Sequence, residues 1–122
     1  MNAHLVISVL LCAATCETKQ LRIWDGDSFL VGMQSGSERI RVQNIDAPEI
    51  DGQCIEEIQR ANWAKNRLAD IMNESRVEIV RSGKDKYGRT LARVSVNGVD
   101  AGGTLIAEGL ARVWTGRRQP WC

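Results

Sequence analysis

Three short clusters of charged residues have the types and spacings that catalysis could use. They lie at residues 25–28 (Asp-Gly-Asp-Ser), at Arg41 with residues 46–49 (Asp-Ala-Pro-Glu), and at residues 85–89 (Asp-Lys-Tyr-Gly-Arg). Taken alone, each cluster is also typical of a solvated turn or loop. Taken together, the carboxylate oxygens suit a hard cation such as Ca²⁺, and arginine forks neutralise a phosphoryl group. The combination predicts metal-assisted hydrolysis of a phosphodiester.

The composition of the 122 residues argues against several other chemistries. His4 is the only histidine, which disfavours both a histidine-rich zinc site and a histidine general base. No nucleophile of the serine-hydrolase type accompanies the three clusters. The length indicates one globular domain and not a two-domain enzyme.

The formal net charge of +1 suggests by itself neither a nucleic-acid binder nor an acidic tail. This average hides a split along the chain. Residues 17–75 carry seven basic and eleven acidic side chains, whereas residues 76–122 carry nine basic and four acidic ones. A nearly neutral chain of this kind can still present one electropositive face.

The N-terminal residues 5–14 form an uncharged run that is too short to span a bilayer as a helix. The run has the length of the apolar core of a secretory signal peptide, so residues 1–16 are expected to be a leader that is removed. The alternative is a buried first strand whose alternation is masked. The leader predicts a periplasmic or secreted bacterial protein, with residues 17–122 as its single domain.

Removal of the leader would leave two cysteines, Cys54 and Cys122. An even pair in an oxidising compartment predicts a disulfide. Because the bridge would enclose nearly seventy residues, it could stabilise the domain by about 4 kcal/mol. The alternative is two free thiols.

The hydrophobic pattern predicts a mainly β fold with α-helices. Apolar residues alternate at 21–24, 29–31 and 39–45, recur three or four apart from about 55 to 73, and form further strands at 77–80 and 91–96. A short second helix is expected from Asp100, its cap, towards Gly109. Five strands with the main helix between the third and the fourth match the order of an OB-fold barrel.

The three clusters, in this order, resemble the thermonuclease (staphylococcal nuclease-like) family. The family pattern includes residues 25–28, Arg41 with 46–49, residues 85–92 and the Gly-Leu-Ala-Arg-Val segment at 109–113. The similarity covers roughly residues 20–115. Each cluster alone is a weak signal, but four in order and register make a chance match improbable.

The resemblance implies a calcium site in the first half of the chain. Asp27 and Asp46 would be Ca²⁺ ligands, the backbone carbonyl of Ala47 would be a third protein ligand, and Asp25 would reach the metal through water. The choice of metal comes from the resemblance, since carboxylate oxygens also accept Mg²⁺ or Mn²⁺.

The resemblance also implies the catalytic and substrate-binding residues. Glu49 would be the general base that activates water, and Arg41 and Arg89 would clamp the scissile phosphate and stabilise its charge in the transition state. Lys86 and Tyr87 resemble the residues that contact a neighbouring phosphate and the nucleoside.

Members of this family cleave the P–O5′ bond of DNA and RNA and leave 3′-phosphate products. The expected protein is therefore a monomeric nuclease with little sequence specificity and no stable membrane association. The alternative is a non-catalytic nucleic-acid-binding OB-fold module. A pure binder gains nothing from carboxylates beside a phosphate, so the presence of Asp27, Asp46 and Glu49 beside Arg41 and Arg89 favours the enzyme.

The sequence departs from the family pattern near its end. In the family pattern, an aromatic residue stacks on the nucleobase at the position that corresponds to Thr115. The nearest aromatic residue of this chain, Trp114, lies one position earlier. A shift of one residue on a strand points a side chain to the other face, so a core position and an external position for Trp114 both stay open. Arg117 and Arg118 are expected to form an exposed basic tail without specific contacts, and the alternative is that they extend the track that binds phosphates.

Overall fold

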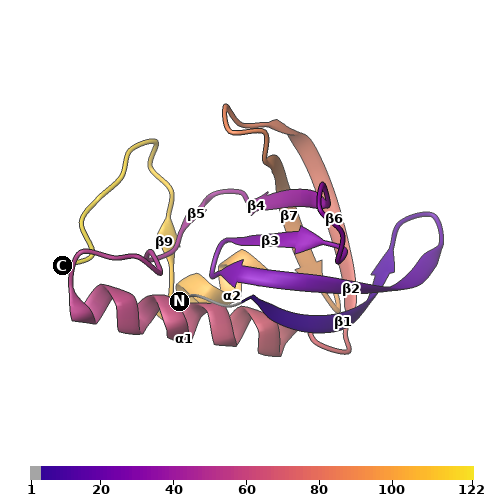
Figure 1. Ribbon diagram of the computed structural model, residues 1–122, viewed down its shortest axis with the longest axis horizontal. Coiled ribbons are helices and arrows are strands. Elements are labelled where there is room, and N and C mark those ends of the chain that lie inside the picture. Colours follow the sequence, from indigo (N-terminus) through magenta and orange to yellow (C-terminus); the bar gives the residue numbers. More distant parts are fainter. Residues whose placement is uncertain (1–3) are drawn as a thin grey trace.

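The computed structural model describes residues 4–122. In this range the chain forms a strand-rich barrel with two helices (Figure 1). The strands are β1 (Leu5–Cys12), β2 (Cys16–Asp25), β3 (Ser28–Val31), β4 (Glu38–Val42), β5 (Ile45–Asp46), β6 (Arg76–Lys84), β7 (Thr90–Val96), β8 (Val99–Asp100) and β9 (Arg112–Val113). The helices are α1 (Ile55–Met72) and α2 (Ala101–Ala107).

The barrel closes because its two end strands also pair with each other. Neighbouring strands follow the order β4-β3-β2-β1-β6-β7, and β4 pairs in parallel with β7, from Ile40 opposite Thr90 to Val42 opposite Ala92. β8 continues the sheet beyond β7, and β5 and β9 form a separate antiparallel pair. The predicted OB-fold class, with the main helix following the first strands, is confirmed.

β1 is the strand that the sequence analysis did not place in the barrel. It pairs with β2 along its whole length, from Leu5 opposite Ile23, and with β6 at Leu10 opposite Arg76. Residues 5–12 thus form the buried first strand that was the alternative to a leader, whereas removal of residues 1–16, which would also remove this strand, stays a prediction. The sequence of β1 shows no alternation of apolar and polar residues, because the outward-facing Val6 and Leu10 are as apolar as their buried neighbours on the strand.

The core lies inside the barrel and beneath α1. The largest fully buried side chains come from the strands and from one face of the helix, and include Leu21, Ile23, Phe29, Ile40, Leu68 and Met72. Figure 1 shows α1 running along one end of the barrel, below β1 and β2. The three-to-four spacing of its apolar residues thus predicted both the helix and its buried face, and Trp63, off that stripe, is 55% exposed.

The second helix begins where its cap residue predicts. Asp100 precedes α2, and its Oδ2 accepts a hydrogen bond of 2.7 Å from the backbone N–H of Gly103. Such a side-chain cap satisfies one of the N–H groups that a helix start leaves without a partner. The helix ends at Ala107, just before Gly109, whose φ of +74° stops further helical propagation.

All four cysteines are paired. Cys54 and Cys122 form a disulfide across 68 positions, and Cys12 and Cys16 form a second one at the turn between β1 and β2. The second bridge was missed because residues 12 and 16 fell in the expected leader. Figure 1 shows that the first bridge brings the C-terminus beside the start of α1.

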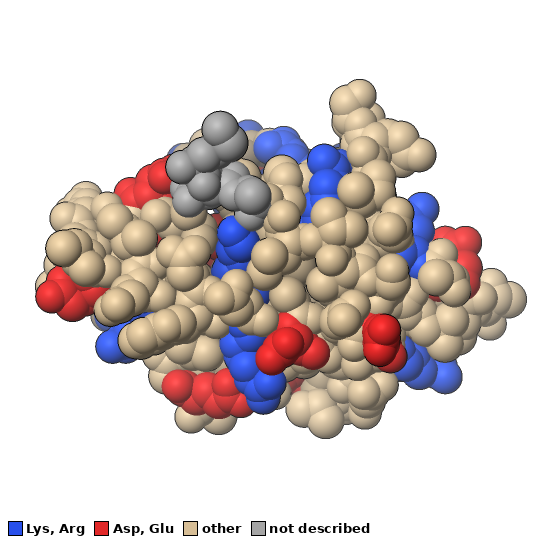
Figure 2. Space-filling model, turned by 60° about the horizontal axis from the view of Figure 1, so that its bottom comes forward, with Lys and Arg blue, Asp and Glu red and all other residues tan. Residues whose placement is uncertain are grey.

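Charged side chains of both signs are dispersed over the face shown in Figure 2, among a larger uncharged area. This mixture agrees with the small net charge and gives no single-sign field over that face. Within residues 4–122, neither helix is long and apolar enough to span a membrane.

Candidate active site

The structure gathers the three clusters around one cavity of about 650 Å³ at an end of the barrel, called the site cavity below. Eight of the predicted site residues line it: Asp25, Asp27, Arg41, Asp46, Glu49, Lys86, Tyr87 and Arg89. They come from the end of β2 and the β2–β3 turn, from β4, from β5 and the loop between it and α1, and from the β6–β7 turn. Residues that are up to 64 positions apart are therefore available to act on one substrate.

The first cluster is a tight turn that packs directly on α1. A Cβ at Gly26 would lie 2.7 Å from the Cβ of Ala64, so only glycine allows this approach. Asp25 closes the turn, because its Oδ1 accepts hydrogen bonds from the backbone N–H of Asp27 at 3.0 Å and from the Ser28 hydroxyl at 2.7 Å. The helix thus fixes the position at which Asp27 meets the cavity.

Asp27 joins the first cluster to the second. It is 6% exposed, its Oδ2 accepts a hydrogen bond of 2.9 Å from the backbone N–H of Ala47, and the same oxygen lies 3.5 Å from Nη1 of Arg41. Burial, and then the neighbouring charge of Asp25, raise the pKa of Asp27 well above its usual range, although Arg41 acts in the opposite direction. A further positive charge at this carboxylate would relieve both unfavourable effects.

Arg41 is held rigidly by main-chain oxygens. From β4 it donates through Nη1 to the carbonyl of Val42 at 2.6 Å and through Nη2 to the carbonyl of Ile45 at 2.9 Å. A guanidinium carries five N–H donors, so these two bonds fix its plane and leave donors for a phosphate oxygen.

Asp46 and Ala47 lie in the buried strand β5 and just after it. Asp46 is 4% exposed, and its Oδ2 is 3.9 Å from Nε of Arg112, the residue opposite it on β9. Ala47 is 1% exposed, and its N–H group is the donor to Asp27. Two buried carboxylates, Asp27 and Asp46, therefore both line the site cavity.

This donor set fits a hard cation with two protein carboxylates and further oxygen ligands. Buried carboxylates are costly without a compensating charge, and Ca²⁺ or Mg²⁺ takes oxygens from carboxylates, carbonyls and water. Among residues 4–122, no group of three or more His, Cys, Asp or Glu side chains is arranged to hold a metal. Any metal here would therefore need main-chain or water oxygens as well.

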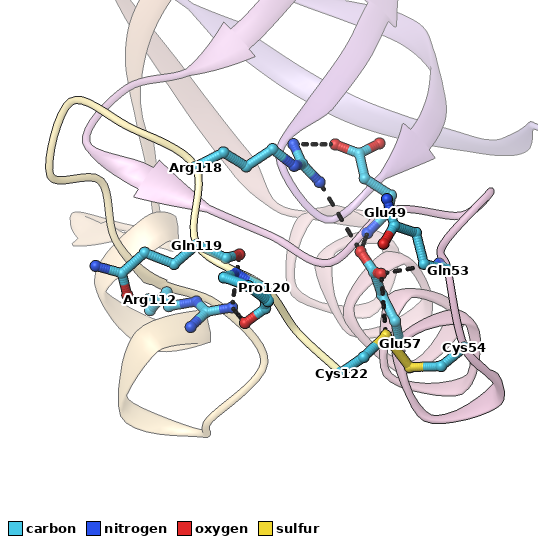
Figure 3. Close-up of a disulfide and its surroundings, with 9 residues drawn as sticks. All are labelled: Glu49, Gln53, Cys54, Glu57, Arg112, Arg118, Gln119, Pro120 and Cys122. Atoms are coloured by element: carbon cyan, nitrogen blue, oxygen red, sulfur yellow. Dashed lines mark hydrogen bonds and ion pairs between the residues drawn. A yellow bond between two sulfur atoms is a disulfide. The ribbon is translucent and has the colours of Figure 1, made fainter.

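Glu49 lies across the cavity in the loop between β5 and α1. Its Oε1 forms an ion pair of 2.8 Å with Nη1 of Arg118, and its backbone N–H donates to Oε2 of Glu57 at 3.0 Å (Figure 3). Glu57, in the first turn of α1, is 5% exposed and also accepts from the N–H of Gln53. The loop that carries Glu49 is thus held from the start of the helix.

The third cluster is an ordered turn in which Asp85 is the anchor. Its Oδ1 accepts from the N–H groups of Tyr87 and Arg89, and its Oδ2 accepts from Nε of Arg89 at 2.8 Å. Burial alone would raise the pKa of Asp85, but the hydrogen bonds from Arg89 and Tyr87 bring it below its usual value. Gly88, with a φ of +80°, supplies the left-handed position of the turn.

The aromatic ring of this turn is open to solvent. Tyr87 is 62% exposed, and its ring centre lies 5.3 Å from Nζ of Lys86 and 5.6 Å from Cζ of Arg89. Arg39 on β4 donates to the Tyr87 carbonyl and so ties the turn to the barrel. A flat, exposed ring flanked by two cations suits contact with a nucleoside.

Two residues at the site were not predicted to belong to it. Trp114, left open between core and surface, lines the site cavity and is 41% exposed, and its backbone N–H donates to the carbonyl of Asn44. Arg118 is exposed, as expected, but it lines the same cavity and pairs with Glu49, whereas a tail without specific contacts was expected. The nearby Cys122 was the available signal, because a disulfide to Cys54 draws the residues before it towards α1.

The chain is similar to several known nucleases. The model of the family described as "Staphylococcal nuclease homologue" matches residues 39–120. A thermonuclease of Staphylococcus intermedius is 35% identical over 95 residues, which are 75% of this chain and 55% of the relative. A micrococcal nuclease of Shigella flexneri is 38% identical over 74 residues, which are 61% of this chain and 39% of the relative.

A third relative is the endonuclease YncB of Bacillus subtilis (strain 168), which is 32% identical over 97 residues. Those residues make up 75% of this chain and 45% of the relative. The chain thus spans about half the length of the curated relatives it matches. Because the family model matches residues 39–120 and the fold is the expected barrel, the chain belongs to the staphylococcal nuclease family.

Proposed function

We propose that this protein is a metal-dependent nuclease that hydrolyses phosphodiester bonds of DNA and RNA with little sequence specificity. The observation that carries the proposal is the site cavity, into which Asp27, Asp46, Glu49, Arg41 and Arg89 all open. Family membership supports it, since the relatives named above are a thermonuclease, a micrococcal nuclease and an endonuclease.

Glu49 is the general base of the proposed reaction. Its carboxylate takes a proton from a water molecule, whose oxygen then forms a bond to phosphorus. The P–O5′ bond breaks, and its electron pair leaves with O5′, which takes up a proton from solvent. The phosphate therefore stays on the 3′ oxygen of the product.

The two arginines neutralise the charge that makes a diester resist attack. Arg41 is fixed by main-chain carbonyls and Arg89 by Asp85, so both guanidinium groups are oriented before substrate arrives. Such preorganised donors stabilise charge that develops on the phosphate oxygens. Lys86 and Tyr87, on the same turn as Arg89, contact a neighbouring phosphate and the nucleoside.

Asp27 and Asp46 would hold the metal, with the carbonyl of Ala47 as a main-chain ligand, and Asp25 would act through water. Ca²⁺ is the proposed ion, and when bound it would add positive charge beside the scissile phosphate. The raised pKa of Asp27 supports a cation at this place, because the buried carboxylate lacks full compensation from Arg41 alone.

The proposal extends to the state and location of the protein. The protein acts as a monomer without stable membrane association. It works in an oxidising compartment, the periplasm or the exterior of a bacterial cell, where disulfides persist. The support is that all four cysteines are paired.

The deciding experiment incubates the purified protein with plasmid DNA, single-stranded DNA and RNA, in Ca²⁺, Mg²⁺, Mn²⁺ or chelator. Degradation is expected with Ca²⁺ and not with chelator, and the products should carry 3′-phosphates, as measured by the resistance of their 3′ ends to labelling until phosphatase treatment. Binding to nucleic acid without metal-dependent degradation would instead identify a non-catalytic OB-fold module.

A further inference from the structure

The C-terminal segment, residues 117–122, lies against the loop that carries Glu49. Nη1 of Arg118 is 2.8 Å from Oε1 of Glu49, and Nη2 of Arg118 is 3.8 Å from Oε2 of Glu57. Figure 3 shows the Arg118 side chain reaching from this segment to both carboxylates. One guanidinium thus contacts the Glu49 side chain and the residue that holds the Glu49 backbone.

The segment is anchored behind Arg118 at two points. The Cys54–Cys122 disulfide joins its end to the residue that precedes α1. On the other side Arg112 donates through Nη2 to the carbonyls of Gln119 at 3.3 Å and Pro120 at 2.8 Å, and its guanidinium lies 3.6 Å from the ring centre of Trp121. The residues that follow Arg118 are therefore fixed by Cys54 and by Arg112, and Arg118 is held at the site cavity from that end of the segment.

Glu49 needs such a partner, because its side chain is 46% exposed and several torsions separate its carboxylate from the backbone. An unheld glutamate at that exposure samples several rotamers, and ordering it costs entropy. The ion pair engages Oε1, one of two carboxylate oxygens, so Oε2 can still accept a proton from water. The contact is charge-assisted, and such a hydrogen bond is stronger than one between neutral groups.

We infer that Arg118 is a positioning residue for Glu49, and that the Cys54–Cys122 disulfide sets its position. The inference rests on the hydrolysis proposed above, in which Glu49 is the base. Arg118 orients the carboxylate for attack on phosphorus, and the disulfide holds Arg118 close enough to do so. Loss of either one releases the same side chain, so both act through Glu49.

The first test compares steady-state kcat and KM on a labelled single-stranded oligonucleotide for Arg118→Ala and Arg118→Lys. Because small displacements of a catalytic group are costly, Arg118→Ala is expected to lower kcat about tenfold or more, with little change in KM. Arg118→Lys is expected to recover part of that loss, because it restores a cation. The matched control is Arg117→Ala, the exposed arginine one position earlier.

The second test is a double-mutant cycle between Arg118→Ala and Cys122→Ser. The effects on kcat of two changes that act through one side chain are not additive. The double variant is therefore expected to have the same kcat as the single variant with the lower kcat. The matched control is the Cys12→Ser/Cys16→Ser protein, which lacks only the other disulfide and is expected to keep the wild-type kcat. If Cys122→Ser does not fold, by far-UV circular dichroism, the comparison of alanine and lysine at position 118 still decides.

The outcomes separate this inference from the proposed function. A wild-type protein without metal-dependent nuclease activity overturns both. An active wild type in which Arg118→Ala keeps full kcat, or gains activity because Arg118 had blocked Glu49, overturns only the positioning role. A rise in KM with an unchanged kcat would assign Arg118 to substrate binding, and it would also overturn the positioning role.

Discussion

Oδ2 of Asp27 accepts a hydrogen bond of 2.9 Å from the backbone N–H of Ala47. This bond joins the turn between β2 and β3 to the loop after β5, which carries Asp46 on one side and Glu49 on the other. The two clusters are 20 positions apart in the chain, and neither could form a site alone. The bond keeps the two proposed metal carboxylates, Asp27 and Asp46, on one wall of the site cavity.

Asp27→Asn is expected to abolish metal-dependent activity without unfolding the protein. The asparagine oxygen can still accept the hydrogen bond from the backbone N–H of Ala47. The change also removes a buried carboxylate, whose pKa is raised by burial and by Asp25. Without metal its melting temperature should therefore equal or exceed that of the wild type. Ca²⁺ should raise the melting temperature of the wild type but not of Asp27→Asn. Asp70→Asn, at an exposed position of α1, is the control, and an equal Ca²⁺ response of all three proteins would contradict the assignment.

Glu49→Gln and Arg89→Ala are each expected to lower nuclease activity by about a hundredfold or more, because one removes the base and the other a donor to the phosphate. Far-UV circular dichroism should stay unchanged, since both side chains lie at the cavity and not in the core. Glu56→Gln and Arg93→Ala, at exposed positions, control for the change in charge. Near-normal turnover in either site variant would refute its role.

Cys122→Ser is expected to destabilise the fold more than loss of the other disulfide. A bridge across 68 positions limits the unfolded chain more than one across four; the chain-entropy values are about 4 and about 2 kcal/mol. Urea denaturation of Cys122→Ser and of Cys12→Ser/Cys16→Ser under non-reducing conditions measures the difference. Equal midpoints for Cys122→Ser and the wild type would remove the stabilising role of the Cys54–Cys122 bridge.

The ion pair between Glu38 on β4 and Arg81 on β6 should make stability depend on pH. Arg81 donates to both carboxylate oxygens, at 2.8 and 2.7 Å, and these hydrogen bonds lower the pKa of Glu38. A lowered folded-state pKa gives stability that is present above the unfolded-state value, about 4.3, and is lost as pH falls through the folded-state value. Both side chains are partly exposed, so Glu38→Gln should cost only about 0.5 kcal/mol at pH 7.

This cost should begin to fall as the pH drops below about 4.3, the unfolded-state pKa, and should vanish only below the lowered folded-state pKa, where the folded wild-type carboxylate is also protonated. Urea denaturation of both proteins at pH 7, 5 and 3 tests the trend. Glu17→Gln, an exposed position on β2, controls for the loss of one negative charge. A cost for Glu38→Gln that stays constant or grows towards low pH would contradict the assigned pKa direction.

Ile7→Ala is expected to destabilise the protein by about 2–4 kcal/mol, the usual cost of truncating a buried isoleucine. Ile7 is 8% exposed inside the barrel, whereas its neighbour Val6 is 51% exposed. Val6→Ala on the same strand should therefore have a much smaller effect. Equal stability of the two variants, or an isolated protein that begins after residue 16, would show that β1 is not part of the working domain.

The sequence by itself determined the local chemistry and most of the elements. The three-to-four spacing of apolar residues gave α1 to within one residue of its end, because an amphipathic face must be buried whichever partner covers it. The residue types of the three clusters predicted carboxylates and arginines at strand ends, where turns present them to solvent. Their order also pointed to the family that the match to residues 39–120 shows.

Only the tertiary structure decided what lies beside what. Arg118 meets Glu49 across 69 positions, and this contact depends on the path that a distant disulfide imposes on the C-terminal segment. The role of β1 was equally hidden, because Val6 and Leu10 on its outer face are apolar and conceal the period of two on which a strand is recognised. The local sequence pattern indicates which residues are buried and which form turns. The pairing of distant residues follows from closure of the whole barrel.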